Sequence, residues 1–297
     1  MAREHRLLWA LVLGITLFVA ELSLAFLSRS LALLADSGHL FLDVFALGLA
    51  FWASLISGRK PDQRYTYGYH RAEVLAAALN AFLLYVLAGF VVYEALERLR
   101  SPVSVLPRPM LAMAVAGLFG NFLTAWLLGS HGKHDLNMRA AFLHVLGDAL
   151  GSVAVLVAAL ATMFFGAAWV DPAASLLISG IILFGASRVL RQALKVLAEG
   201  VPEGLSLAEI AAAITSFPGV REVHDLHVWS IGPRFPVLTA HLVVGDLSLR
   251  EAEALGQSLR KMLRERFGIE HVTFQMEGGA CSGPSCNGPS EGKKCAR

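Results

Sequence analysis

Two histidine–aspartate pairs stand inside long apolar stretches of this sequence. In A-D-S-G-H-L-F-L-D at residues 35–43, His39 comes four residues before Asp43; in L-H-V-L-G-D at residues 143–148, His144 comes four residues before Asp148. Residues four apart lie on the same face of a helix, so the members of each pair can point in one direction. Two such helices side by side would offer two imidazoles and two carboxylates to one point.

This donor set suits a zinc-type cation, because zinc takes histidine nitrogen and carboxylate oxygen in tetrahedral sites. Two ionised aspartates and two neutral histidines balance the charge of a divalent cation, which an apolar surround tolerates far better than bare carboxylates. The alternative is that each pair is a contact within or between helices, with no metal. A second matching pair favours the metal, because an ionisable residue at membrane depth costs about 2.5–3.5 kcal/mol.

The composition indicates a membrane protein that carries a smaller soluble part. Of the 297 residues, 56% are hydrophobic and 16% are charged, and the mean hydropathy is +0.59. One soluble domain is rarely so apolar. The net charge is only +2 and the basic residues are spread between the apolar segments, which argues against nucleic acid as a partner.

Six runs of about 20 apolar residues can each cross a bilayer as a helix, the first as an uncleaved span. They cover residues 7–27, 31–56, 72–96, 110–128, 140–165 and 172–190. Lysines and arginines are concentrated in the segments that share one side with both termini, which favours cytoplasmic termini.

Polar residues interrupt these spans. Glu21, Asp36, Asn80 and Asn121 are expected to be interhelical hydrogen-bond partners. Asp36 also shares the helical face of His39, so it could line an entrance or cap the helix start. Small residues beside the second pair permit close helix approach; these are Gly147, Gly151 and Ser152.

Past residue 195 the pattern is that of a small soluble domain. Amphipathic helices are predicted at 206–216 and 248–267, and strands at 221–231, 237–244 and 271–277. The order α-β-β-α-β predicts helices packed on a small antiparallel or mixed sheet, too small to bury a large core alone, which favours pairing with a second copy. The predicted domains are therefore 1–195, 196–277 and a Gly/Ser/Pro-rich tail at 278–297 that holds all three cysteines.

The sequence resembles the cation diffusion facilitator family, and within it the zinc-transporting branch with histidine in both membrane pairs. The resemblance covers nearly the whole chain and is carried by the two H-x-x-x-D pairs, Y-G-Y-H-R-A-E at 67–73, D-P at 171–172 and V-H-D-L-H-V-W at 223–229. It implies a homodimer of six-helix membrane bundles with cytoplasmic ferredoxin-like domains. It also implies a transporter, not an enzyme, that exports zinc, often with cadmium or cobalt, in exchange for protons.

The resemblance implies the metal ligands as well. The transport site takes His39, Asp43, His144 and Asp148, and the cytoplasmic site takes His224, His241 and Glu277, with Gln275 where some relatives use histidine. Relatives add cysteines just after the last strand; Cys281 and Cys286 are the candidates here, although four intervening residues separate them in place of the usual two. The alternative for His224 and His227 is ordinary polarity on the solvent side of the sheet.

Two loops carry further histidine or aspartate positions. Some bacterial relatives bind zinc between spans two and three with one aspartate and two histidines, whereas this sequence has Asp62 with Tyr65 and Tyr69 at the histidine positions. The loop site is therefore predicted to be absent or weak. In the loop at 129–139, His131 and His134 either collect zinc at the cytoplasmic mouth or are merely solvated.

The predicted function is export of zinc from the cytoplasm by proton-coupled, alternating-access antiport, across a bacterial cytoplasmic membrane, with zinc also as a regulatory ligand. Histidine must be neutral to bind metal and titrates near neutral pH, so metal and protons can displace each other. Two other classes stay open. An intramembrane metalloenzyme would need an open coordination position and a general base, and no H-E-x-x-H motif is present. A metal-sensing receptor would explain the soluble domain but not a complete ligand set in the spans.

Overall fold

The computed structural model of the chain describes residues 15–16, 18–129, 136–233 and 235–279, with the backbone alone at 123–129 and 136–145. The chain divides into two compact units, Met1–Ala50 with Ala77–Leu190 and Phe51–Ala76 with Arg191–Arg297. The second unit therefore holds the connection between the second and third predicted spans together with the C-terminal domain.

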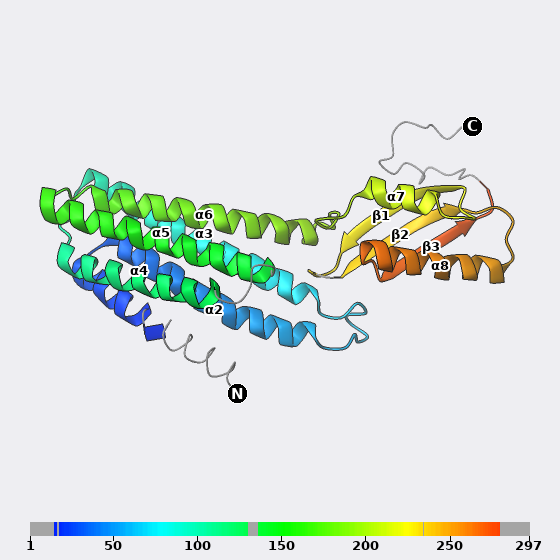
Figure 1. Ribbon diagram of the computed structural model, residues 1–297, viewed down its shortest axis with the longest axis horizontal. Coiled ribbons are helices and arrows are strands. Elements are labelled where there is room, and N and C mark those ends of the chain that lie inside the picture. Colours follow the sequence, from blue (N-terminus) through cyan, green and yellow to red (C-terminus); the bar gives the residue numbers. More distant parts are fainter. Residues whose placement is uncertain (1–14, 17, 130–135, 234, 280–297) are drawn as a thin grey trace. The chain divides into compact units, whose positions relative to one another are not determined.

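Long apolar helices form the membrane part of the chain (Figure 1). They are a short helix at Phe18–Ser28, then α2 (Leu31–Ser57), α3 (Arg71–Arg100), α4 (Pro107–Gly129), α5 (Leu136–Phe165) and α6 (Val170–Leu197). In the part of the chain that is described, α2, α3, α6 and Leu146–Phe165 of α5 are each long and apolar enough to cross a membrane. The second to sixth predicted spans each coincide with a helix, and the first is helical where it is described, at residues 15–16 and from residue 18 onward.

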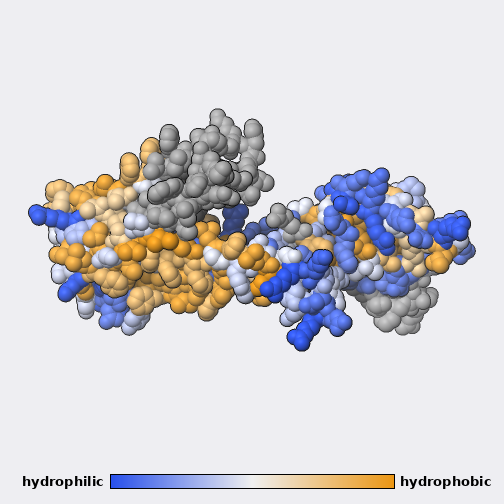
Figure 2. Space-filling model, turned by 90° about the horizontal axis from the view of Figure 1, so that it is seen from below, coloured by the Kyte–Doolittle hydropathy of each residue, from blue (hydrophilic) through white to orange (hydrophobic). Residues whose placement is uncertain are grey.

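The outer surface of these helices is apolar, and their interior contains many small side chains together with a few large ones such as Leu31 and Met110. Figure 2 shows apolar residues over most of the visible surface of this part. Phe119, Phe164 and Phe184 are 67%, 70% and 77% exposed, whereas the buried core contains Ala88 and Ala158 at 0%. Close packing through small residues, with large apolar side chains facing outward, is typical of helices in lipid.

The N-terminus of α2 is held by a side chain from α6. The first four N–H groups of a helix have no partner within the helix. Asp171, which is fully buried, accepts hydrogen bonds from the amides of Leu31 (2.9 Å) and Ala32 (3.4 Å) and from the hydroxyl of Ser30 (2.5 Å). Arg98 of α3 brings its Nη1 within 4.0 Å of the same carboxylate. One buried aspartate thus ties together α2, α3 and α6.

The C-terminal domain has the predicted order α-β-β-α-β. Its elements are α7 (Leu207–Thr215), β1 (Glu222–Ser230), β2 (Pro236–Val243), α8 (Leu249–Phe267) and β3 (His271–Glu277). The sheet order is β1-β2-β3; β1 and β2 are antiparallel whereas β2 and β3 are parallel, so the sheet is mixed. Side chains such as Ile210 of α7, Leu242 of β2 and Leu263 of α8 are fully buried in one core.

Local signals explain where the two helices of this domain begin and end. Ser206 caps α7 by accepting the amide of Glu209, as S-L-A-E predicts. Ser248 and Glu251 form a reciprocal capping box at the start of α8, and Gly268 ends that helix at φ 67°, a left-handed conformation that glycine adopts without strain. The boundaries are therefore encoded locally.

Candidate functional site

Three of the predicted membrane ligands lie close together. His39 and Asp43 come from successive turns of α2, with His39 Nδ1 3.7 Å from Asp43 Oδ1. Asp148 comes from α5 and places its Oδ1 3.8 Å from His39 Nε2. One ligand atom from each residue lies within 4.8 Å of the others. Metal–ligand bonds of about 2.0–2.2 Å in a tetrahedron separate ligand atoms by about 3.3 Å, so small side-chain rotations would close this set around one ion.

The fourth predicted ligand, His144, lies in α5, four residues before Asp148. Its side chain is outside the described part of the chain. The helical spacing places the two residues on one face of α5, which is the face that Asp148 turns toward His39.

The cluster opens onto a small polar cavity between the helices. The cavity is about 60 Å³, enough for several water molecules, and Glu21, Asp36, Asn121 and Ser152 line it with the three ligands. Glu21 and Asp36 share a hydrogen bond between their carboxyl groups. The cavity therefore places two carboxyl groups beside the candidate ligands.

The sequence predicted these polar residues as contacts between helices, and Asp36 also as a residue that lines an entrance or caps the start of its helix. That expectation holds for Glu21 with Asp36 and for Asn121, whose Nδ2 donates to Ser152 Oγ at 3.4 Å. Asn80 Oδ1 is buried, and among the described residues it has no hydrogen-bond partner. The lining role of Glu21 was missed; for Asp36, the shared helical face with His39 was the available signal.

Glycines give this cavity its room. A Cβ built on Gly151 would lie 3.0 Å from Asp36 Oδ1, and one on Gly117 would lie 3.1 Å from Ser152 Oγ. Gly151 therefore permits the close approach that the sequence predicted. For Gly147, one turn earlier on the same side of α5, a Cβ would meet no atom of the described residues within 4 Å, so close approach at that residue stays a prediction.

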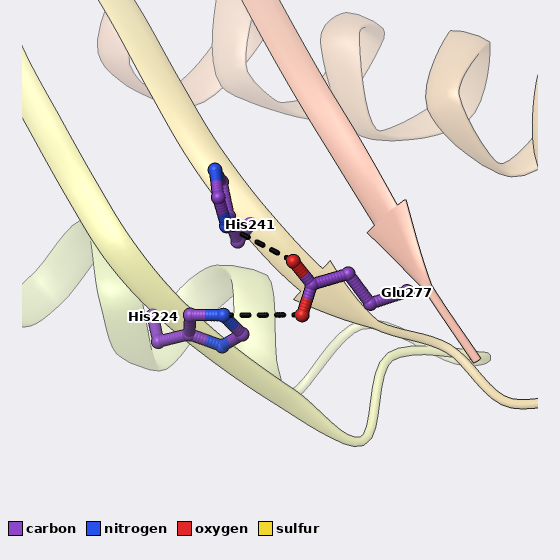
Figure 3. A group of neighbouring side chains, drawn as sticks. All are labelled: His224, His241 and Glu277. Atoms are coloured by element: carbon purple, nitrogen blue, oxygen red, sulfur yellow. Dashed lines mark ion pairs between the residues drawn. The ribbon is translucent and has the colours of Figure 1, made fainter. Parts of the chain in front are cut away.

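A second cluster lies on the sheet of the C-terminal domain (Figure 3). His224 on β1 and His241 on β2 are directly opposite in the antiparallel register, and Glu277 ends β3. The Glu277 carboxylate reaches both rings, with Oε2 3.2 Å from His224 Nε2 and Oε1 3.0 Å from His241 Nδ1. The ligand atoms lie within 4.8 Å of one another. Two imidazoles and one carboxylate are a donor set that fits zinc.

The two histidines of the V-H-D-L-H-V-W stretch differ in whether their side chains face solvent. The side chain of His224 is only 10% exposed and faces Glu277, whereas that of His227 is 57% exposed and contacts Asp225. Gln275 Nε2 donates to Glu277 Oε1 at 2.9 Å, so it orients the carboxylate. Two sets of predicted positions lie outside the described residues: Cys281 and Cys286, and His131 and His134.

The loop between α2 and α3 is closed by its own hydrogen bonds. Asp62 accepts the amides of Arg64 and Tyr65, both at 2.8 Å, and the hydroxyl of Tyr69 at 2.6 Å. The Tyr69 hydrogen bond, followed by the two amides, holds the pKa of Asp62 below its ordinary value, and the same bond raises the pKa of Tyr69. With its oxygens engaged in this way, Asp62 is poorly placed to bind metal, and the absence of a loop site stays a prediction.

Apolar helices around a zinc-type cluster, joined to a soluble domain with a second such cluster, define a multi-pass membrane protein that handles divalent metal cations. Two family models match the chain: "Cation efflux transmembrane domain" at residues 7–198 and "Cation efflux protein, cytoplasmic domain", whose short name ZT_dimer denotes dimerisation, at residues 202–278. The chain belongs to the cation efflux family, the cation diffusion facilitators, in its zinc-transporting branch. The six-helix bundle with a cytoplasmic α+β domain is thereby confirmed as its fold class.

The relatives that resemble the chain are transporters. Zinc transporter ZitB of Escherichia coli is 42% identical over 95% of this chain and 90% of its own length. The cadmium, cobalt and zinc/H(+)-K(+) antiporter of Bacillus subtilis is 39% identical over 85% and 82%, and the metal cation efflux system protein CzcD of Cupriavidus metallidurans is 40% identical over 94% and 88%. A solved structure, the metal-bound C-terminal domain of the CzcD transporter, is 40% identical over 25% of this chain and 99% of that chain; its TM-score of 0.23 supports no structural argument. The family and these relatives are transporters and not enzymes.

Proposed function

We propose that this chain exports zinc from the cytoplasm as a proton-coupled antiporter, by alternating access through a site made of His39, Asp43, His144 and Asp148. The observation that carries the proposal is the meeting of His39 and Asp43 of α2 with Asp148 of α5 at one cavity inside the membrane helices. Ionisable residues inside a membrane are costly, and a cation bound by two aspartates removes that cost.

The donor set determines which cations fit. Two imidazole nitrogens favour zinc, cobalt or cadmium over magnesium and manganese, which prefer oxygen-only sites. The printed names of the relatives, which include zinc, cadmium and cobalt, support the same range. Zinc is therefore the proposed substrate, with cadmium and cobalt as further substrates.

Protons are the proposed counter-substrate. A histidine binds metal only when neutral and titrates near neutral pH, so protonation and metal binding exclude each other. Exporting a divalent cation against an inside-negative potential costs about 4.6 kcal/mol per 100 mV, and returning protons offset part of that work. The carboxyl pair Glu21–Asp36 supports this exchange, since both groups line the same cavity and a carboxylate can take up a proton. The H(+)-K(+) antiport in the name of the Bacillus relative points the same way.

The cytoplasmic cluster is the proposed regulatory site. Zinc held by His224, His241 and Glu277 would join three strands at one corner of the sheet and draw the domains of two protomers together when cytoplasmic zinc rises. Cys281 and Cys286 would add ligands from the tail. The proposed organisation keeps a membrane domain at 1–195, a cytoplasmic domain at 196–277 and a tail at 278–297. Both termini are cytoplasmic, and the host membrane is the bacterial inner membrane, as the bacterial relatives support.

Flux in liposomes tests the transport proposal. Purified protein is reconstituted with a zinc-sensitive dye inside and a pH gradient across the membrane. Zinc flux should follow the pH gradient, and Asp148→Asn should lower it at least tenfold. The control Glu97→Gln removes an exposed carboxylate from α3 and should keep the flux. Zinc binding without flux in the parent protein would identify a sensor and refute the transporter.

Two further variants address selectivity and regulation. His39→Asp exchanges nitrogen for oxygen and should shift the preference away from zinc toward harder or larger cations; an unchanged zinc-to-cadmium flux ratio would contradict the site assignment. His241→Ala should abolish activation by zinc on the cytoplasmic side while basal flux and zinc binding in the membrane persist. If membrane-site binding is lost as well, the two sites do not have separate roles.

A further inference from the structure

Strand β1 contains an extra residue at the cytoplasmic cluster. His224 pairs with His241 and His227 pairs with Thr239, so three steps along β1 match two steps along β2, and the register shifts between them. This is a β-bulge, a feature that re-aims side chains and is common beside functional sites. Asp225, inside the bulge, has φ 48°, a left-handed conformation that is uncommon for a residue other than glycine. The sequence did not predict this feature.

The bulge changes which side chains share a face. Successive side chains of a regular strand alternate between faces, so His224 and His227, three residues apart, would lie on opposite sides of the sheet. Because β2 advances by only two residues over the same stretch, both histidines pair with residues on one face of β2. The bulge therefore places both His224 and His227 on the face of the sheet that carries His241.

The carboxylate of Asp225 lies between His227 and His241. Its Oδ1 is 3.1 Å from His227 Nε2, and its Oδ2 is 3.6 Å from His241 Nε2, just beyond the length of a hydrogen bond. On the other side of the ring, His241 Nδ1 is 3.0 Å from Glu277. His241 thus has a carboxylate at each ring nitrogen.

The chemistry of imidazole means that when one ring nitrogen of His241 binds a metal, the other must donate a hydrogen bond. Neutral imidazole carries one N–H and one lone pair. If Nδ1, which faces Glu277, gives its lone pair to a metal, the proton must lie on Nε2 and needs an acceptor. Metal-binding histidines almost always donate that N–H to a carboxylate, a carbonyl or water, which fixes the ring and raises its basicity.

We propose that Asp225 is a positioning residue of the cytoplasmic metal site, which accepts the Nε2–H of His241 and is itself oriented by His227. The inference rests on the proposed binding of zinc by His224, His241 and Glu277. It adds Asp225 and His227 as residues that orient these ligands without binding the metal. The competing explanation is that Asp225 serves only the backbone, because aspartate tolerates the left-handed region better than most residues.

Zinc affinity of the full-length chain separates these explanations. The protein is purified in detergent micelles with Asp43→Asn and Asp148→Asn to silence the membrane cluster, and the Kd for Zn²⁺ is measured by competition with a chromogenic chelator. Asp225→Gly keeps a left-handed backbone but removes the acceptor, and it should raise the Kd 10–100-fold, the usual effect of losing such a partner. Asp225→Asn keeps both the backbone conformation and an acceptor oxygen, so its Kd should rise less.

The control Glu222→Gln removes an exposed negative charge from the same strand and should leave the Kd within about twofold of the parent protein. The melting temperature of the metal-free protein should not fall in either Asp225 variant, since glycine and asparagine both accept the conformation. If Asp225→Gly binds zinc like the parent, or its affinity loss follows a loss of melting temperature, Asp225 is a backbone residue only. If His241→Ala also leaves zinc binding unchanged, the proposed cytoplasmic site itself is wrong.

Discussion

Replacing Asp171 should loosen the start of α2 more than any exposed substitution nearby. Asp171→Ala leaves the amides of Leu31 and Ala32 and the hydroxyl of Ser30 without their acceptor. Loss of a helix cap costs about 1 kcal/mol, and breaking a buried ion pair costs about 3–5 kcal/mol. Arg98 lies at the 4.0 Å limit and keeps Glu94 at 3.0 Å, so the ion-pair cost falls below that range. We expect a total of about 3 kcal/mol for alanine and about half of that for asparagine, which retains one acceptor oxygen.

Hydrogen exchange on the reconstituted protein measures this effect locally. A loss of about 3 kcal/mol accelerates exchange through local opening by about 100-fold at the amides of residues 31 and 32, and asparagine should give roughly tenfold. Glu97→Gln, an exposed carboxylate on α3, serves as the control and should leave these amides unchanged. Should Asp171→Ala exchange at the parent rate there, the carboxylate is not what holds α2, and the assignment of the cap is refuted.

Three other outcomes are expected. Gly151→Ala pushes a methyl group to 3.0 Å from the Asp36 carboxylate and should lower zinc flux about tenfold, whereas Gly147→Ala on the same helix should keep it; equal flux in the two variants would contradict the cavity geometry. Because hydrogen bonds hold the folded-state pKa of Asp62 below the unfolded value of about 3.9, its contribution to loop order is complete above that value and is lost as the pH falls through the folded-state pKa. Exchange protection of residues 62–69, corrected for intrinsic rates, should therefore fall on strong acidification, and Tyr69→Phe should lower it already at pH 6. Ser248→Ala should cost roughly 1 kcal/mol and speed exchange in the first turn of α8 about fivefold, and an unchanged rate would refute the capping box.

The elements were predictable because their signals are local. The apolar runs, the serine caps and the turn residues gave the membrane helices and the α-β-β-α-β order, and the four-residue spacing of His39 and Asp43 placed both on one helical face. The observed boundaries of β1 and β2 differ from the predicted ones by one residue at each end, and those of β3 match at both ends. Each of these features depends on neighbours within a few turns of chain.

The remaining features depend on how elements pack and could not be predicted from one sequence. The contact of Glu21 with Asp36 requires knowing which faces of the first two helices meet. The different surroundings of Gly147 and Gly151, among the described residues, depend on which neighbouring side chains lie beside each successive turn of α5. The bulge at Asp225 depends on the register between two strands, which the residue pattern of β1 alone does not fix.

The three proposed zinc ligands of the C-terminal domain, His224, His241 and Glu277, lie at one corner of a sheet whose stability comes from its apolar core and strand pairing. Leu238 and Leu242 of β2 are fully buried with Leu259 and Leu263 of α8, and every strand has a hydrogen-bonded neighbour along its length. A zinc finger collapses without its ion because it has no such core. Removal of zinc from the proposed site should therefore leave the domain folded and loosen only the corner of the sheet that holds the ligands. A domain of this kind can bind and release metal repeatedly without unfolding.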